Sequence, residues 1–128
     1  MSYQAVILTV SDSCAAGTRT DTSGPAIRAM LENAGFAVQA MQTVPDEEGQ
    51  ISAAIVHACD ILQADLVVTT GGTGLSARDV TPEATLAVLD REIRAIPVAM
   101  WVEGLKSTPR AMLSRAVAGI RGHTLVLN

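Results

Sequence analysis

Acidic and small polar residues follow three apolar segments of this 128-residue chain. The segment 5–10 is rich in branched residues, which is typical of a buried strand, and we expect further strands at 36–44 and 65–70. The loops that follow them begin at Ser11, Pro45 and Gly71 and carry hydroxyls, carboxylates and glycine amides. Such groups bind phosphates and divalent cations. We therefore expect an anion or metal–phosphate site where these loops meet.

The glycine-rich turn Gly71-Gly72-Thr73-Gly74 directly follows the third apolar segment and precedes a helical pattern. Glycine lets backbone N–H groups approach an anion closely, and threonine hydroxyls add further donors. The turn matches neither GxGxxG nor the GxxxxGK[ST] motif of P-loop nucleotide hydrolases, and it contains no lysine. Because glycine also serves tight turns, an anion site and a purely structural turn both remain open.

Two aspartates, Asp46 and Asp79, lie at the ends of loops that we expect on the same sheet edge. Taken singly, each is typical of a helix cap, whose carboxylate accepts backbone N–H groups. Taken together beside the glycine-rich turn, they could hold Mg²⁺ against phosphates, as phosphoryl and nucleotidyl transfer require. The pair is therefore a candidate for both catalysis and metal binding.

Other reactive side chains lack the partners that their chemistry needs. His57 and His123 have no Cys, His, Asp or Glu set at zinc-ligand spacing nearby. Cys14 lies in the first of the three loops without a histidine to activate it. Cys14 and Cys59 form no CxxC pair, so we expect two reduced thiols in a cytoplasmic protein. The chain also has no GxSxG elbow, which leaves an α/β-hydrolase unsupported.

Composition excludes further classes of function. The net charge is −4 and there is no Lys/Arg run, which argues against nucleic-acid binding. No apolar run reaches the length of a membrane span, and the residues from Met1 to Gln4 do not resemble a signal peptide. With 48% hydrophobic and 17% charged residues, the chain is expected to form one globular domain over residues 1–128. The high apolar fraction also favours contacts between subunits.

The elements that must position these residues alternate between strands and helices. Helices are expected at 25–34, where Thr22 or Ser23 would provide the cap, and at 47–63, 81–89, 96–106 and 108–115, with a hairpin around 121–123 that ends in a strand at 124–127. This order predicts an α/β three-layer sandwich, with a mainly parallel sheet, helices on both faces and a C-terminal hairpin. Ligands of such sheets bind beyond the carboxyl ends of the strands.

The order of these motifs closely resembles the MogA/MoaB family, which includes molybdopterin adenylyltransferases and the G domain of gephyrin. The matching blocks are Ser11-Asp12-Ser13, Ser23-Gly24-Pro25, Val44-Pro45-Asp46, Thr69-Thr70-Gly71-Gly72-Thr73-Gly74, the segment from Arg78 to Ala84, and the segment from Ala111 to Gly122. The resemblance covers essentially the whole chain and implies a MogA-like fold. The long block from Thr69 to Ala84 is far more specific than a glycine-rich turn alone.

The resemblance implies an enzyme of molybdenum cofactor biosynthesis that uses Mg²⁺ and ATP to adenylylate the terminal phosphate of molybdopterin before molybdate insertion. It implies that Asp46 and Asp79 are essential and bind the Mg²⁺. The positions that match the family's substrate pocket are Ser11, Asp12, Thr70, Gly71, Gly72, Thr73, Gly74 and Ser76. The resemblance further implies a cytoplasmic homotrimer, or a hexamer, that acts together with a molybdenum-insertion protein.

Three features depart from the family pattern. The family usually continues with a Leu-Pro-Gly-x-Pro turn and a final helix, whereas this sequence stops at Asn128, so it resembles a short form. Trp101 and Gly104 stand where an arginine and a serine are expected, and tryptophan cannot supply arginine's contact to an anion. These departures leave open an alternative function, that of a non-catalytic molybdopterin-binding or scaffold protein of the same family.

Overall fold

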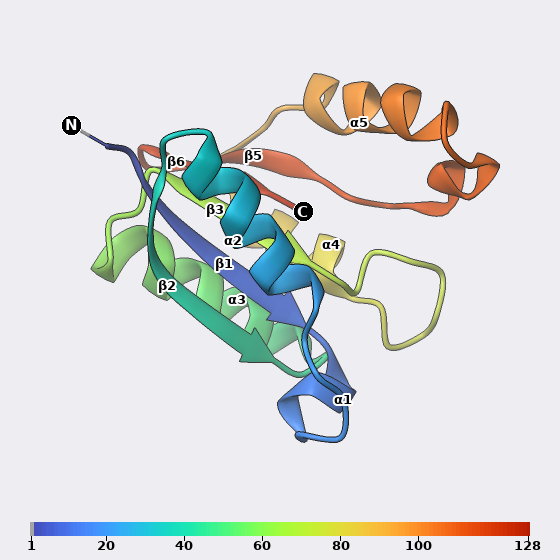
Figure 1. Ribbon diagram of the computed structural model, residues 1–128, viewed down its shortest axis with the longest axis horizontal. Helices are drawn as coiled ribbons and strands as arrows, with labels where there is room; N and C mark the ends of the chain where they lie inside the picture. The colour runs from blue at the N-terminus through green and yellow to red at the C-terminus, as the bar shows by residue number, and fades with distance from the viewer. Residues whose placement is uncertain (1) are drawn as a thin grey trace.

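The computed structural model describes residues 2–128, in which a six-stranded sheet lies between helices on both faces (Figure 1). The strands are β1 (Gln4–Val10), β2 (Ala37–Val44), β3 (Leu66–Thr70), β4 (Arg91–Glu92), β5 (Ala118–Arg121) and β6 (Thr124–Leu127). Their order in the sheet is β2-β1-β3-β6-β5-β4. The first four strands in this order are parallel, and β5 pairs antiparallel with both β6 and β4. The predicted mainly parallel sheet with a C-terminal hairpin is confirmed.

The central strand β1 is buried on both faces, which explains its unbroken apolar sequence. Its side chains Val6, Leu8 and Val10 point into the main core, where they meet Ile51 and Ile55. Because the neighbouring strands β2 and β3 both pair parallel with β1, their carboxyl ends finish at the same edge of the sheet. The loops that carry the candidate site residues therefore begin side by side.

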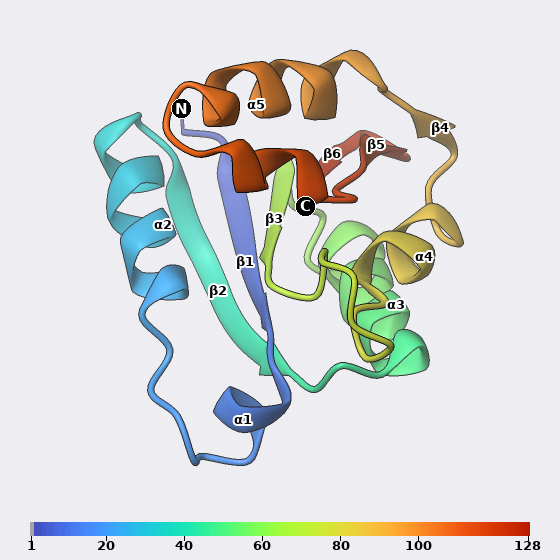
Figure 2. The same ribbon diagram turned by 90° about the vertical axis from the view of Figure 1, so that its right-hand side faces the viewer.

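The helices cover the two faces of the sheet because two successive connections between strands run in opposite directions along it. It steps from β1 to β2 through α2 (Ser23–Asn33) and returns to β3 through α3 (Glu48–Val56). Since both crossovers are right-handed, the two helices must lie on opposite faces, as Figure 2 shows. The remaining helical elements are α1 (Asp12–Ala15), α4 (Thr81–Leu86), α5 (Ala95–Leu105), the π-helical turn η1 (His57–Ile61) and the 3₁₀ turn η2 (Pro109–Leu113). α4 packs against α3, whereas α5 packs mainly against η2.

Several element boundaries differ from the sequence-based expectations. The helix expected at 47–63 is α-helical only to Val56 and ends in the π-helical turn η1. The helix expected at 81–89 stops at Leu86, and the one expected at 108–115 is a short 3₁₀ turn. The loop from 11 to 22 contains the short helix α1, and the edge strand β4 was not expected. The shortened helices differ only at their ends, whereas α1, β4 and η2 are elements of two to five residues, too short to show a periodic pattern.

The N-cap of α2 is Thr22, one of the two residues expected there. Thr22 makes no capping hydrogen bond, because its backbone is already close to helical (φ −107°, ψ −26°). The carboxylate of Asp21 takes that role, with its Oδ1 accepting a hydrogen bond from the Gly24 N–H at 3.0 Å. Oδ2 of the same carboxylate accepts from the Thr9 hydroxyl at 2.8 Å, which fixes the start of α2 against β1.

None of the helices between residues 2 and 128 combines the length and apolar character needed to cross a lipid bilayer. Cys14 and Cys59 are both free thiols, as expected. Cys59 is buried, and burial raises the pKa of its thiol.

Candidate functional site

The loops after β1 and β2 are joined by a reciprocal pair of hydrogen bonds between two aspartates. The Asp12 N–H donates to Asp46 Oδ2 at 3.0 Å, and the Asp46 N–H donates to Asp12 Oδ1 at 2.9 Å. The Ser11 N–H also donates to the Val44 carbonyl at 2.9 Å, which extends the contact from the strands into the loops. Asp12 and Asp46 are therefore held side by side at the carboxyl edge of the sheet.

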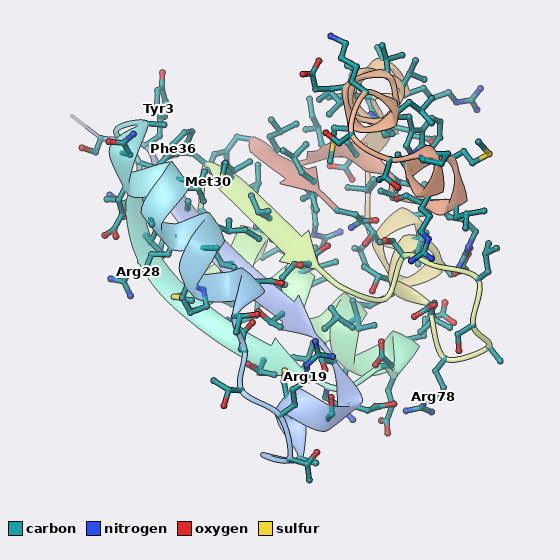
Figure 3. The ribbon with its side chains drawn as sticks, turned by 45° about the vertical axis from the view of Figure 1, so that its right-hand side comes forward. Tyr3, Arg19, Arg28, Met30, Phe36 and Arg78 are labelled. Carbon is teal, nitrogen blue, oxygen red and sulfur yellow. The ribbon has the colours of Figure 1, made fainter. Side chains whose placement is uncertain are left out.

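Arg78 joins the third loop to this pair. Its Nε donates to Asp12 Oδ2 at 3.0 Å and its Nη2 donates to Asp12 Oδ1 at 2.9 Å, a bidentate ion pair. Figure 3 shows Arg78 extending from the loop before α4 toward the segment that follows β1. The hydrogen bonds from Arg78 and from the Asp46 N–H lower the pKa of the Asp12 carboxyl. Because both side chains are about half exposed, this contact orients the loops more than it stabilises the fold.

Asp46 does not cap the helix that follows it, contrary to the structural interpretation of its sequence position. The N-cap of α3 is Glu47, and no side chain makes a capping hydrogen bond there. The carboxylate of Asp46 turns toward the glycine-rich turn instead. Its Oδ1 lies 3.1 Å from the position that a Cβ of Gly72 would occupy. One carboxylate oxygen of Asp46 thus serves Asp12, while the other faces Gly72.

The turn itself requires glycine at its first two positions. Gly71 and Gly72 have φ angles of +92° and +70°, which side chains other than glycine rarely adopt. A Cβ on Gly71 would collide with the carbonyl of Val10, and a Cβ on Gly72 would collide with the hydroxyl of Thr81. Thr81 holds the turn by donating its hydroxyl to the Gly71 carbonyl at 3.0 Å and its N–H to the Gly72 carbonyl at 3.1 Å.

Asp79 folds back onto its own loop and does not cap α4. The N-cap of α4 is Val80, which makes no side-chain capping hydrogen bond. The Ser76 N–H donates to Asp79 Oδ2 at 3.0 Å, and the Asp79 N–H donates to the Ser76 carbonyl at 3.0 Å. Asp79 Oδ2 also lies 2.8 Å from the position that a Cβ of Gly74 would take. Gly74, Ser76 and Asp79 therefore form one cluster within the loop.

The remaining candidate residues line two cavities beside the turn. Ser11, Thr70 and Gly71 line a polar cavity of about 170 Å³ together with residues of the segment 19–23. In Figure 3 the side chain of Arg19, from this segment, lies near the end of β1. Thr70, Gly71 and Thr73 also line a larger cavity of about 380 Å³ on the other side of the turn, between α2 and α5. Ser11 in addition caps α1, because its Oγ accepts from the Cys14 N–H at 3.2 Å.

The structure thus brings the predicted residues together in two clusters beside one turn. Asp12, Asp46 and Gly72 form the first, and Gly74, Ser76 and Asp79 form the second. Within residues 2–128 no three Cys, His, Asp or Glu side chains converge as a metal-ligand group. A divalent cation at this edge would therefore need water or phosphate oxygens among its ligands, which is how Mg²⁺ commonly binds in nucleotide sites.

The sequence analysis missed two arginines, Arg78 and Arg115. Arg115 donates to the carbonyls of Gly74 and Asp79 and to the carboxylate of Glu83 in α4. Both arginines stand in blocks that carry the family resemblance, and Arg78 directly precedes Asp79. Because anion sites use arginine so often, a basic residue in such a block of an acidic chain was a usable signal.

Comparisons with known proteins identify relatives of this chain. A family described as "probable molybdopterin binding domain" matches residues 6–128. A molybdopterin adenylyltransferase of Helicobacter pylori is 39% identical over 126 residues, which cover 95% of this chain and 70% of that enzyme. The crystal structure of the molybdopterin biosynthesis enzyme MoaB from Thermus thermophilus is 48% identical and superposes with a TM-score of 0.93, covering 98% of this chain and 79% of that one.

A longer relative contains the same region as one part of a larger protein. The molybdenum cofactor synthesis protein cinnamon of Drosophila melanogaster is 39% identical over 123 residues. These residues cover 95% of this chain but only 20% of the fly protein.

Proposed function

The chain belongs to the family of probable molybdopterin-binding domains, and on this premise we propose that it is a molybdopterin adenylyltransferase of molybdenum cofactor biosynthesis. The observation that carries the proposal is the meeting of three loops at one sheet edge. Asp12, Asp46 and Arg78 lock these loops together around the turn at Gly71 and Gly72. Such a turn with free acidic oxygens beside it suits a Mg²⁺-bound phosphate chain.

The proposed reaction joins the terminal phosphate of molybdopterin to the α-phosphate of ATP and releases pyrophosphate. An oxygen of the terminal phosphate of molybdopterin attacks the α-phosphorus of ATP, and the bond from that phosphorus to the β-phosphate oxygen breaks. Adenylyl-molybdopterin and pyrophosphate are the products. Catalysis of such a transfer consists mainly of positioning and of charge neutralisation.

The residues take separate roles in this proposal. Asp46 and Asp79 are the catalytic carboxylates and would hold the Mg²⁺, which when bound neutralises charge on the phosphates. The donors fit that ion, because each aspartate keeps one carboxylate oxygen outside the hydrogen bonds that fix the other. The substrate-binding residues are Ser11, Asp12, Thr70, Gly71, Gly72, Thr73, Gly74 and Ser76, with backbone N–H groups of the turn facing phosphate.

The setting of the reaction belongs to the same proposal. Two free thiols fit the reducing cytoplasm. We also propose a homotrimer, with a hexamer as the other arrangement, because α5 and η2 expose a group of apolar side chains: Val98, Met100, Val102, Leu105, Met112 and Leu113. The adenylylated product would pass to a molybdenum-insertion protein.

The experiment that tests the function combines binding and turnover in one sample. Molybdopterin is titrated calorimetrically into the purified protein, and pyrophosphate release is then followed after Mg²⁺ and ATP are added. We expect binding and release, and we expect Asp46→Asn and Asp79→Asn each to reduce kcat by ~10²-fold or more, as the loss of a group that neutralises charge in the transition state does.

The matched control is Glu32→Gln, which removes an exposed carboxylate on α2 whose partner is Arg28. It should leave both binding and release unchanged. Binding without release in the wild-type protein would instead support a molybdopterin-binding or scaffold protein and contradict the enzyme. Full activity of the two aspartate variants would contradict the catalytic assignment.

A further inference from the structure

The guanidinium of Arg115 lies against the loop that carries Asp79. Its Nε donates to the Gly74 carbonyl at 2.8 Å, and its Nη2 donates to the Asp79 carbonyl at 2.7 Å. The backbone N–H of Arg115 donates to the Thr73 carbonyl, also at 2.8 Å. One residue, 36 positions beyond Asp79, therefore fixes the carbonyls at both ends of the loop.

The same guanidinium ties this loop to the helix that follows. Nη1 and Nη2 donate to the two carboxylate oxygens of Glu83 at 2.6 Å and 3.3 Å. Glu83 lies in the first turn of α4. The hydrogen bond from Arg115 lowers the pKa of the Glu83 carboxyl, which favours the charged form that pairs with Arg115. The loop, its aspartate and α4 are thus joined at one planar group.

The geometry of the peptide bond gives these contacts a further consequence. In a trans peptide the carbonyl of one residue and the N–H of the next point in opposite directions. Because the carbonyls of Thr73 and Gly74 are turned toward Arg115, the N–H groups of Gly74 and Leu75 are turned away from it. In the part of the chain that the structure describes, neither N–H has a protein acceptor. Two adjacent, unpaired N–H groups are suited to a phosphate oxygen.

We propose that Arg115 is the positioning residue of the adenylyl-transfer site, which acts by orienting the carboxylate of Asp79 and the N–H groups of Gly74 and Leu75. This inference rests on the proposed function for its chemistry and on the structure for its geometry. Arg115 is not a catalytic residue here, since its donors are directed at carbonyls of the protein and at Glu83.

Lysine cannot replace arginine in this role. A guanidinium presents five N–H donors in a rigid plane, whereas an ammonium is a single point of charge on a flexible stem. No one position of a lysine nitrogen could serve Gly74, Asp79 and Glu83 together. The variant Arg115→Lys therefore keeps the charge but releases part of the loop.

The chain offers a closely matched control in Arg121. This arginine also makes a bidentate ion pair, with Asp60 at 3.2 Å and 2.8 Å, and also donates to one carbonyl, that of Val88, at 2.9 Å. It lies where β5 turns into β6, opposite the start of β6 and so away from the carboxyl ends of the parallel strands. Arg121→Lys removes the same kind of contact without touching the site.

The test measures loop order and catalysis separately. Amide hydrogen exchange is recorded by NMR for Ser76, Asp79 and Thr81, whose N–H groups are bonded within the loop. Arg115→Lys should speed their exchange by ~10-fold and Arg121→Lys should not, since only the first loses charge-assisted bonds to this loop. In pyrophosphate release, Arg115→Lys should lower kcat by ~10- to 100-fold with a smaller change in KM, because misplaced groups cost rate.

Each outcome decides the proposal. Unchanged exchange in the loop of Arg115→Lys, or an equal loss of kcat in the two arginine variants, would overturn it. If the wild-type protein releases no pyrophosphate, the proposed function fails, while the exchange data still decide whether Arg115 orders the loop. Glu83→Gln provides a second variant for the case in which Arg115→Lys does not fold, and it should change exchange and kcat in the same direction by less.

Discussion

At the scale of single residues, Asp12 connects the three loops of the site. Two hydrogen bonds join it to Asp46 and two join it to Arg78, although its side chain is about half exposed. A contact of this kind adds little to global stability. Its effect is instead to decide where the loops after β1, β2 and β3 lie relative to one another.

The ion pair between Arg78 and Asp12 makes the contact between their loops depend on pH, and the direction of this dependence can be measured. Because the hydrogen bond from Arg78 lowers the pKa of Asp12 in the folded protein, the contact contributes fully above the ordinary pKa of an aspartate. It is lost as the pH falls through the lower pKa of the folded state. Arg78→Gln should therefore raise the titration midpoint of the Asp12 carboxyl, as followed by ¹³C NMR.

Asp60 is the internal reference for that titration. Its pKa is lowered by Arg121 in the same way, at a separate place in the molecule. Its midpoint should be identical in the wild type and in Arg78→Gln. An unchanged Asp12 midpoint in Arg78→Gln would show that Arg78 does not pair with Asp12 in solution.

At the scale of elements, the glycine-rich turn requires glycine for two reasons: its positive φ angles and the lack of space for a Cβ atom. Gly72→Ala combines a positive φ angle with a Cβ that meets the Thr81 hydroxyl and Asp46. The strain of the angle alone costs about 1 kcal/mol or more, and displaced neighbours add to it. We expect the free energy of unfolding, measured in urea, to fall by about 2 to 4 kcal/mol.

Gly35→Ala separates the two causes. Gly35 ends α2 with a φ angle of +98°, but no atom lies within 4 Å of the position of its Cβ. That variant introduces only the strain of the backbone angle, and its free energy of unfolding should fall by about 1 kcal/mol. Equal losses in the two variants would mean that the contacts of Gly72 with Thr81 and Asp46 have no energetic weight.

The elements also show what the sequence could and could not predict. The strands β1 and β3 were predicted because their apolar runs reflect burial in the sheet, whereas β2, which was also predicted, is a largely exposed edge strand. The roles of Asp46 and Asp79 as caps were wrong, because the backbone N–H of Asp12, from another loop, and that of Ser76, from the same loop as Asp79, donate to these carboxylates instead. Arg115 was missed because its partners lie 32 to 41 positions away, beyond any local pattern.

Of the two substituted positions in α5, Gly104 acquires a structural reason, whereas nothing in the structure explains Trp101. Gly104 lets α5 approach η2 closely, since a Cβ at this position would lie 2.9 Å from the Cβ of Ala111. Trp101 lines a cavity of about 450 Å³ next to Ser114 and Arg115, and its buried Nε1 donates to no acceptor among residues 2–128. A cavity therefore lies between α5 and the segment that holds Arg115.

At the scale of the whole molecule, α5 exposes a stripe that a monomer rarely leaves uncovered. Val98, Val102 and Leu105 are 45% to 57% exposed, and their i, i+4 and i+7 spacing places them on one face of the helix. Met112 and Leu113 of η2 extend the same apolar surface. Figure 2 shows α5 as the outermost helix above the sheet, with η2 beside it.

This surface is expected to hold the protomers of the proposed homotrimer together. Val102→Glu places a charge in the middle of the stripe, and a charge buried without a partner is strongly unfavourable. The variant should therefore weaken self-association by ~100-fold or more, measured by sedimentation velocity over a range of concentrations.

Met30→Glu is the matched control, because Met30 is 72% exposed on α2 and stands apart from the stripe (Figure 3). An equal effect of the two substitutions would show that α5 is not the interface, and a wild-type protein that sediments as a monomer at all concentrations would remove the proposed trimer. Because α5 and the segment of Arg115 line one cavity, loss of association in Val102→Glu should be accompanied by faster hydrogen exchange in the loop of Asp79. Unchanged exchange would show that the interface and the loop are independent.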